Sequence, residues 1–334
     1  MSVLYLIIFV ACTESRETRL QRFLLQGNEQ MKLSNDAQAI GYYRTALELD
    51  SCFADAWNNL GTVYYRQQNY EEALTSYDHA IGCRQGYTEA FMNRANTFYA
   101  LQQYYSALKD LEKVAERAPD TTVLHFSRGL IFTQLREYDK ALSSFRQALA
   151  NDPKNAETLI NIGTVHYYQH DSDSARILLE KAIALDPDQP NAFNTLALLA
   201  AREGDYAKAM NYMEGALQRK PRDPYFLNNR GYIKLLTGET DEALADIDAS
   251  IMEDPYNAWA YRNKGIYYLK KGDATSAIRL LARALEMSDF VEQGNYYLGE
   301  AYLANGERQK ACENFQQALK LKEITQSEFS KFCQ

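Results

Sequence analysis

The chain has 334 residues, more than one compact hydrophobic core usually holds, yet no linker or shift in composition divides it. Its net charge is -8, with 44 acidic against 36 basic residues, and this acidic balance argues against nucleic acid as a partner. The five cysteines are scattered without Cys-x-x-Cys pairs, so we expect neither a zinc site nor a disulfide framework.

The first predicted element is an apolar run from Val3 to Ala11 that ends at Cys12. A helix needs about 20 residues to span a bilayer, so this run is too short to cross one, but it fits the apolar core of a secretory signal. The letters FVAC at positions 9–12, with polar residues after them, resemble the cleavage box of bacterial lipoproteins. That resemblance implies lipid attachment at Cys12 and a membrane anchor in the bacterial cell envelope.

Residues 1–19 are therefore expected to form a signal and a tether. Two alternatives are a misplaced start codon and an apolar flap over the segment that follows. Either alternative would leave the protein without a lipid anchor, and a cytoplasmic location is then expected.

After this segment one small residue returns every 34 positions. The nine residues are Gly27, Gly61, Ala95, Gly129, Gly163, Ala197, Gly231, Gly265 and Gly299. An alanine follows 12 residues after each of them, at Ala39, Ala73, Ala107, Ala141, Ala175, Ala209, Ala243, Ala277 and Ala311. A fixed period of this length indicates stacked supersecondary units, none of which can bury its apolar face alone. Such an array offers an extended surface and leaves no residues for a separate catalytic domain.

The second unit, Ala54 to Tyr87, shows the pattern of one repeat when the small residue is counted as position 8. Positions 4, 7, 8, 11, 20, 24 and 27 are Trp57, Leu60, Gly61, Tyr64, Ala73, Tyr77 and Ala80. Five units end in a proline at position 32, at Pro119, Pro153, Pro187, Pro221 and Pro255. This pattern resembles the tetratricopeptide repeat, which has W-x2-L-G-x2-Y, then A-x3-F, then P. The resemblance covers residues 20–323 as nine repeats.

The spacing predicts two helices in every repeat. At about 100° per residue, positions 4, 7, 8 and 11 form one apolar stripe, and positions 20, 24 and 27 form another. Gly204, Gly238 and Gly272 mark the turn between the stripes, and proline at position 32 ends the second helix. No strand-like alternation is present, so the fold is predicted to be all-α. The resemblance implies a right-handed superhelical solenoid of antiparallel helix pairs.

The last predicted element is a C-terminal capping helix in residues 324–334. Thr325 and Glu328 have the spacing of a capping box, and Phe329 and Phe332 would share one face. The end of a repeat array needs a cover with a polar outer side, so we expect this helix to close the last repeat.

Motifs that carry catalysis are not found in the sequence. It has no phosphate-binding glycine loop, no His-Glu-x-x-His and no nucleophile elbow. His166 and His170 have a spacing that can hold a metal, but His166 stands where other repeats place a packing aromatic residue. We interpret the two as a core histidine and a turn histidine. The prediction is a protein that is not an enzyme and has no cofactor, no metal and no small-molecule substrate.

Candidate peptide-binding residues lie on the side of each first helix opposite its packing stripe. Asparagine recurs there at position 6, at Asn59, Asn93, Asn161, Asn229 and Asn263. Its amide can both donate to and accept from an extended peptide backbone. In the tetratricopeptide family this face lines the concave groove where partners lie. A similar asparagine ladder lines the repeat domain of the O-linked N-acetylglucosamine transferase.

Tyrosine and arginine complete the predicted groove. Position 12 carries Tyr65, Tyr99 and Tyr167, and position 13 carries Arg66. The alternatives are that the asparagine amides bond their own neighbours and that the tyrosine rings pack between repeats. Basic residues also gather on the first helices and acidic residues on the second, which predicts either a basic groove for acidic partners or ordinary solvated charge.

The predicted function is a scaffold that binds an extended peptide or a helix of a partner protein in this groove and is tethered to a membrane. One alternative is a structural or assembly subunit of a bacterial envelope complex, of the pilus or outer-membrane biogenesis type. The other is a non-catalytic repeat relative of the O-linked N-acetylglucosamine transferase.

Overall fold

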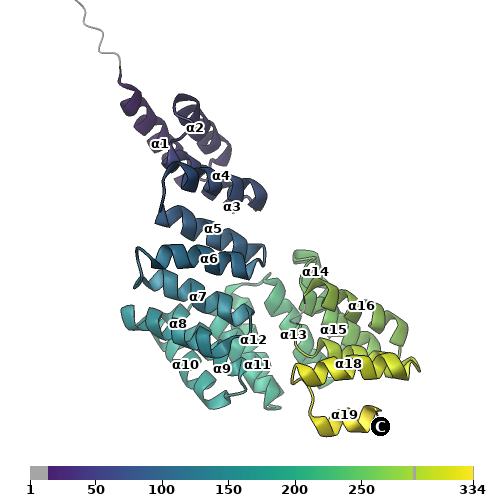
Figure 1. Cartoon of the computed structure of the whole chain (residues 1–334). Coiled ribbons are helices and arrows are strands. Elements are labelled where there is room, and N and C mark those ends of the chain that lie inside the picture. Colours follow the sequence, from purple (N-terminus) through teal and green to yellow (C-terminus); the bar gives the residue numbers. More distant parts are fainter. Residues whose placement is uncertain (1–13, 289–290, 334) are drawn as a thin grey trace, which may run out of the picture. The chain divides into compact units, whose positions relative to one another are not determined.

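The computed structural model describes residues 14–288 and 291–333, and every regular element in these residues is an α-helix. The helices follow one another as antiparallel pairs (Figure 1). The first helices of the pairs are α1 (Arg16–Lys32), α3 (Ala54–Arg66), α5 (Thr88–Ala100), α7 (Thr122–Gln134), α9 (Ala156–Tyr168), α11 (Pro190–Arg202), α13 (Pro224–Thr237), α15 (Ala258–Lys270) and α17 (Gly294–Ala304). The second helices are α2 (Asp36–Leu49), α4 (Tyr70–Cys83), α6 (Tyr104–Ala115), α8 (Tyr138–Asn151), α10 (Ser172–Leu185), α12 (Tyr206–Arg219), α14 (Thr240–Glu253), α16 (Ala274–Met287) and α18 (Arg308–Lys320). The all-α prediction is confirmed.

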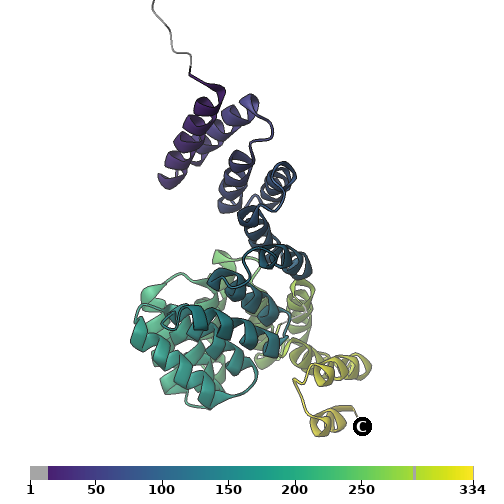
Figure 2. The same ribbon diagram turned by 60° about the vertical axis from the view of Figure 1, so that its left-hand side comes forward.

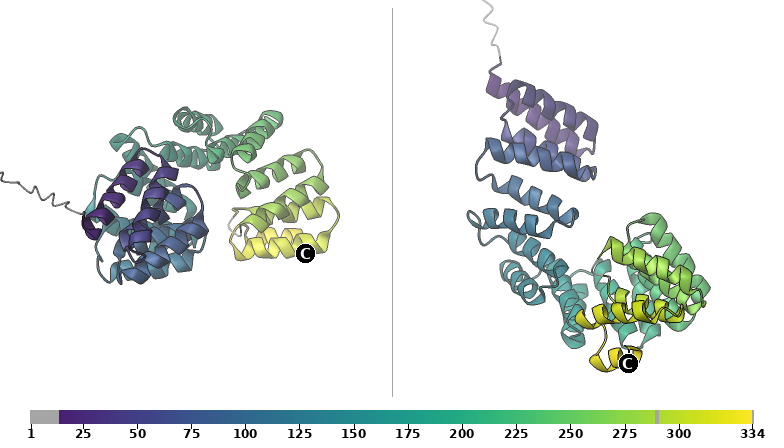
Figure 3. Two further views of the ribbon diagram at one scale, coloured as in Figure 1. Left: turned by 90° about the horizontal axis from the view of Figure 1, so that it is seen from above. Right: turned by 45° about the vertical axis from the view of Figure 1, so that its right-hand side comes forward.

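The chain divides into two compact units, Met1–Pro153 and Lys154–Gln334, which we call the N-terminal and C-terminal units. Within the N-terminal unit, the pairs from α1–α2 to α7–α8 pack each against the next (Figure 2). The C-terminal unit contains α9 to α18 and a short last helix, α19 (Gln326–Cys333), which packs against α18 (Figure 3). Each unit therefore has a core made of layers between successive helices.

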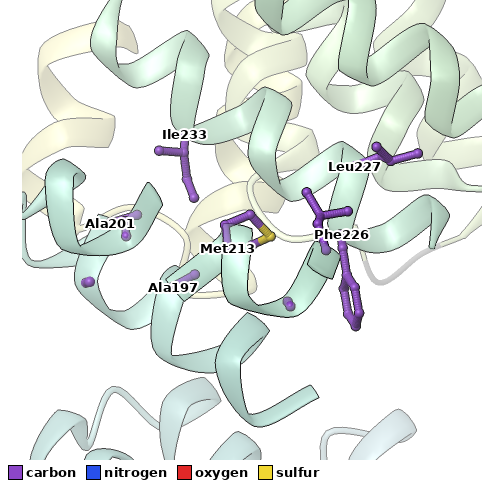
Figure 4. Packing of buried hydrophobic residues seen from close by; sticks show 10 residues of the cluster. Ala197, Ala201, Met213, Phe226, Leu227 and Ile233 are labelled. Atoms are coloured by element: carbon purple, nitrogen blue, oxygen red, sulfur yellow. The ribbon is translucent and has the colours of Figure 1, made fainter. Parts of the chain in front are cut away.

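The two helices of a pair approach most closely at the small residue of position 8. A Cβ added to Gly61 would lie 2.6 Å from the ring of Tyr77, which stands 16 residues later at position 24. The two repeats with alanine at position 8 place Leu111 or Met213 at position 24, and both side chains are fully buried. Figure 4 shows Met213 in the core that it shares with Ala197. Alanine at position 20 is fully buried in all nine repeats, so the predicted packing stripes are confirmed.

Every pair turns through a left-handed residue at position 15. The last four repeats place glycine there, Gly204, Gly238, Gly272 and Gly306, with φ between 79° and 90°. The first five repeats place Ser34, Gln68, Gln102, Arg136 and His170 there, with φ between 57° and 62°. A residue other than glycine pays roughly 1 kcal/mol or more for this conformation. Helix packing therefore imposes the turn even where the local sequence does not favour it.

Two disulfide bonds correct the expectation drawn from the scattered cysteines. Cys52 bonds to Cys83 and Cys312 bonds to Cys333, with Cα–Cα distances of 5.2 and 5.6 Å. Because each repeat folds back on itself, the turn before α3 meets the end of α4 although 31 residues separate the first two cysteines. The second bond joins α18 to α19. The expectation of no disulfide framework was wrong, because sequence spacing does not show which turns and helix ends meet.

The last helix begins with the predicted capping box. Glu328 Oε2 accepts hydrogen bonds from the backbone N–H and the hydroxyl of Thr325, at 2.7 and 2.8 Å. The backbone N–H of Glu328 donates to Thr325 Oγ1 at 3.3 Å in return. Phe332 then stacks on Phe315 of α18, with ring centroids 4.4 Å apart. These contacts and the disulfide hold α19 on the end of the last pair.

Candidate partner-binding surface

A relay of asparagine side chains joins the first helices of the N-terminal unit. Asn93 Nδ2 donates to Asn58 Oδ1 at 3.0 Å, and Asn58 Nδ2 donates to Asn59 Oδ1 at 3.2 Å. Asn59 Nδ2 then donates to Asn28 Oδ1 at 2.7 Å, and the hydroxyl of Tyr43 donates to the same oxygen at 2.8 Å. The relay links α5 to α3, α3 to α1, and α1 to α2. The asparagines of position 6 therefore bond their neighbours, which is one of the two roles that the sequence allowed.

Part of the hydrogen-bonding capacity of this relay remains unused. Asn59 and Asn93 are only partly buried. Nδ2 of each donates one of its two hydrogens, and in the part of the chain that the structure describes no group donates to Asn93 Oδ1. An amide with a free donor and a free acceptor can bond the backbone of an extended peptide.

Two of the predicted tyrosines, Tyr65 and Tyr99, stand in the last turn of α3 and α5. The ring of Tyr65 lies 5.6 Å from that of Tyr70, and the ring of Tyr99 lies 5.8 Å from that of Tyr104. Gln134 Nε2 of the next repeat donates to the hydroxyl of Tyr99 at 3.3 Å. Burial raises the pKa of both Tyr65 and Tyr99 above the usual range of tyrosine. Tyr65 remains 36% exposed and offers an apolar ring with a polar tip.

The basic residues of the first helices are mostly engaged within the protein. Arg66 pairs with Asp36 of α2 and donates to the carbonyl of Met31 at 2.8 Å. The same pattern, a first-helix cation on a second-helix acid, recurs in Arg94 with Asp110, Arg230 with Asp246 and Lys264 with Asp248. These residues therefore do not form the basic groove considered from the sequence.

The asparagines at position 6 of the C-terminal unit differ in how far they are buried. Asn263 is completely buried; its Nδ2 donates to Asn228 Oδ1 at 2.7 Å, and its Oδ1 accepts from Nε and Nη2 of Arg262 at 2.9 and 2.8 Å. Asn229 Nδ2 donates to Asn194 Oδ1 at 2.8 Å, which repeats the relay of the N-terminal unit. Asn161 Nδ2 instead donates to the carbonyl of Glu157 in its own helix, at 2.9 Å. Asn263 cannot reach an open surface, and this corrects its predicted place in the groove.

Tyr167 is only 7% exposed, so it does not lie on the open surface that the sequence predicted for it. The guanidinium of Arg202 lies 3.7 Å from the centre of its ring, and Arg202 Nη1 donates to its carbonyl at 2.6 Å. Glu292 completes this cluster: its carboxylate lies 3.5 Å from Arg202, and its carbonyl accepts from Arg262 Nη1 at 2.7 Å. Side chains of the protein itself thus fill this part of the first-helix face.

Glu292 is a residue that sequence reasoning missed. It stands at position 1 of the ninth repeat, where the other eight repeats carry alanine, proline, threonine or leucine. A charge at a position that is otherwise uncharged was the one available signal. The pattern of a single repeat cannot show that this carboxylate reaches Arg202, which lies 90 residues earlier in the chain.

The two histidines of the fifth repeat take separate places. His166 Nδ1 lies 3.1 Å from Asp171 Oδ2, while His170 is the left-handed residue of the turn, with φ 61°. Within the described residues, no three side chains of the metal-ligating types come together.

A model of the tetratricopeptide repeat family matches residues 24–88, 92–156, 160–224, 195–258 and 262–324. The chain belongs to the tetratricopeptide repeat family. This family is typical of protein-interaction scaffolds and is generally non-catalytic. A search of the curated proteins found no match to this tetratricopeptide repeat protein.

Solved tetratricopeptide repeat structures share the fold. A tetratricopeptide repeat protein from Parabacteroides merdae is 20% identical over 75% of this chain and 98% of its own, with a TM-score of 0.67. PilF of Pseudomonas aeruginosa is 18% identical over 63% of this chain and 96% of its own, with a TM-score of 0.54. Human IFIT1, solved as a dimer with m7Gppp-AAAA, is 21% identical over 80% of this chain and 68% of its own, with a TM-score of 0.58. At this level of identity the likeness shows a shared fold alone.

Proposed function

We propose that this tetratricopeptide repeat protein is a non-catalytic scaffold whose N-terminal unit binds an extended segment of a partner protein. The binding surface would consist of Asn59, Tyr65, Asn93 and Tyr99, which we call the asparagine–tyrosine face. The observation that carries the proposal is the unused hydrogen-bonding capacity of the Asn59 and Asn93 amides, on the same two helices as two tyrosine rings that are held in place. The corresponding Tyr167 and Asn263 of the C-terminal unit are buried and offer no such capacity.

This face suits a peptide backbone better than a charged ligand. Its amides pair with peptide N–H and C=O groups whatever the peptide sequence, and its rings give contact area at a low cost in side-chain entropy. Arg66 at its edge is already paired with Asp36, so a strongly acidic partner gains little there. Specificity would then come from side chains of the partner that contact the tyrosine rings.

The test is a peptide-binding measurement on the whole chain. Peptides selected from a random phage-displayed library would be titrated against the wild type and the Tyr65→Ala/Tyr99→Ala variant. We expect the variant to bind at least about tenfold more weakly, because truncating a central tyrosine of an interface typically costs more than about 1 kcal/mol. Tyr105→Ala is the matched control, since Tyr105 is 73% exposed on α6 and outside the face. Equal binding by the double variant, or an equal loss in the control, would contradict the proposal.

We further propose that Cys12 carries a lipid that anchors the protein in a bacterial cell envelope. Cys12 lies outside the described residues, so the support comes from elsewhere in the chain. The two disulfides suit an oxidising compartment outside the cytoplasm, where such bonds persist. Among the described helices, none is long and apolar enough to cross a bilayer. Stable attachment by lipid takes more than one acyl chain.

Metabolic labelling with a clickable fatty acid in a bacterial host tests this anchor. We expect the wild type to carry the label and to sediment with membranes, and Cys12→Ala to lose both properties. Cys52→Ala/Cys83→Ala serves as the control for cysteine loss elsewhere, and it should keep the label. Absence of label on the wild type, or equal label on the Cys12 variant, would exclude lipidation at Cys12.

A further inference from the structure

A cavity of about 630 Å³ lies among α2, α3 and α4 of the N-terminal unit. Its lining includes the apolar and aromatic side chains of Leu47, Trp57, Leu60 and Tyr64. Trp57 is fixed by ring stacking on His79, at 4.4 Å between centroids, and by a hydrogen bond from its Nε1 to the carbonyl of Ser51 at 2.9 Å. Trp57, Leu60 and Tyr64 share one side of α3, and at about 100° per residue Asn59 points to the other side. None of the four residues of the asparagine–tyrosine face lines the cavity.

The lining also carries an excess of negative charge. Glu48, Glu71 and Glu72 contribute three carboxylates, against one guanidinium from Arg44. Arg44 Nη2 donates to the hydroxyl of Tyr64 at 2.9 Å. Within the residues that the structure describes, none of the three glutamates forms an ion pair. The cavity is thus an apolar and aromatic space with unpaired acids around it.

The next repeat shows what fills the same place in this fold. Arg94 stands 34 residues after Leu60, and its Nε and Nη2 each donate to one carboxylate oxygen of Asp110 at 2.7 Å. The same guanidinium pairs with Asp78 of α4. It lies 5.5 and 5.9 Å from the ring centres of Phe91 and Phe98. Those two rings stand 34 residues after Trp57 and Tyr64, which line the cavity.

The arrangement recurs in the C-terminal unit. Arg230 donates to Asp246 through Nε at 2.8 Å and Nη2 at 2.5 Å. Lys264 pairs with Asp248 at 2.7 Å. All three cations stand at position 7, and each meets an acid of a second helix. The cavity is the corresponding place in the second repeat, where position 7 is Leu60 and carries no cation.

We propose that this cavity binds an arginine side chain presented by a basic segment of a partner protein. The guanidinium would take the place that Arg94 takes one repeat later, beside the rings of Trp57 and Tyr64 and within reach of the free carboxylates. Its apolar stem would lie against Leu47 and Leu60. Attraction between the rings and the cation and charge-assisted hydrogen bonds to carboxylates are the forces that hold Arg94. This site goes beyond the proposed function, because its lining residues are different and it selects a charged side chain.

The test uses a fluorescein-labelled peptide of alternating leucine and arginine, and the same peptide with glutamine for each arginine. The Leu60→Arg/Ser76→Asp variant installs the Arg94–Asp110 pair in the second repeat and fills the cavity from within. We expect it to bind the arginine peptide at least tenfold more weakly than the wild type does, measured by fluorescence anisotropy. Arg44→Asp places an acid where Asp78 stands and should tighten binding at least threefold. The glutamine peptide should bind no variant measurably.

Two further variants keep the outcome decisive. Glu71→Gln/Glu72→Gln should weaken binding severalfold, and Glu112→Gln on α6, outside the cavity, should leave it unchanged. If circular dichroism shows that Leu60→Arg/Ser76→Asp does not fold, the binding of Glu71→Gln/Glu72→Gln and of Arg44→Asp tests the proposal without it. Equal binding of the two peptides, or full binding by the filled cavity, would overturn the proposal. Peptides selected for the asparagine–tyrosine face should bind the filled variant as they bind the wild type, so failure at one site leaves the other untouched.

Discussion

Arg94→Met is expected to lower the free energy of unfolding by about 3 kcal/mol or more, because it leaves a buried carboxylate without its partner. Asp110 is only 3% exposed, and both of its oxygens accept hydrogen bonds from Arg94. These hydrogen bonds raise the pKa of the Arg94 guanidinium, as expected for a cation that the fold stabilises. Urea denaturation followed by circular dichroism measures the loss, and hydrogen exchange in α5 and α6 locates it.

Two controls separate this effect from a general loss of charge. Arg94→Leu/Asp110→Ser installs the residues that the second repeat carries, and it should cost less than the single change because no charge stays buried. Arg222→Met removes an exposed pair with Glu253, in which the arginine side chain is 79% exposed. Exposed pairs contribute about 0–1 kcal/mol, so little change is expected there. A single variant as stable as the double variant would show that the buried pair has no special role.

Gly61→Ala is expected to destabilise the N-terminal unit by about 1–3 kcal/mol, the usual cost of overpacking a core. The added Cβ would lie 2.6 Å from Tyr77, whose ring is only 1% exposed and cannot move aside. The third and sixth repeats pair alanine with Leu111 or Met213 instead. The loss of unfolding free energy in Gly61→Ala/Tyr77→Leu should therefore be smaller than the sum of the losses in the two single variants. Strict additivity in thermal unfolding would contradict this account of the close approach.

Much of the fold follows from the sequence because all nine repeats carry the same packing constraint. Position 8 must be small wherever position 24 carries a bulky side chain, and Gly61 with Tyr77 shows this as clearly as Ala95 with Leu111. The glycine turns, the helix stripes and the capping box at Thr325 depend on neighbours in the sequence. Such features can be predicted without knowing how one repeat contacts another.

The remaining features depend on contacts between repeats, which the repeat pattern does not encode. Gln68 adopts the left-handed conformation because two packed helices require it, although its own sequence does not favour it. Asn59 and Asn263 occupy the same position in their repeats, but only Asn263 meets Arg262 and becomes fully buried. Equivalent positions of the repeat therefore differ in exposure, and the sequence pattern could not show which of them are buried.

The two disulfides make the two ends of the repeat array differ in how readily their helices open. Each repeat contacts only its neighbours, so opening starts where a pair has a neighbour on one side only. The Cys312–Cys333 bond closes the last pair with its capping helix, whereas the first pair, α1 and α2, has no covalent closure among its described residues. Opening that begins at α1 meets the Cys52–Cys83 bond at the second pair. We therefore expect amide hydrogen exchange in α1 and α2 to be faster than in α18 and α19.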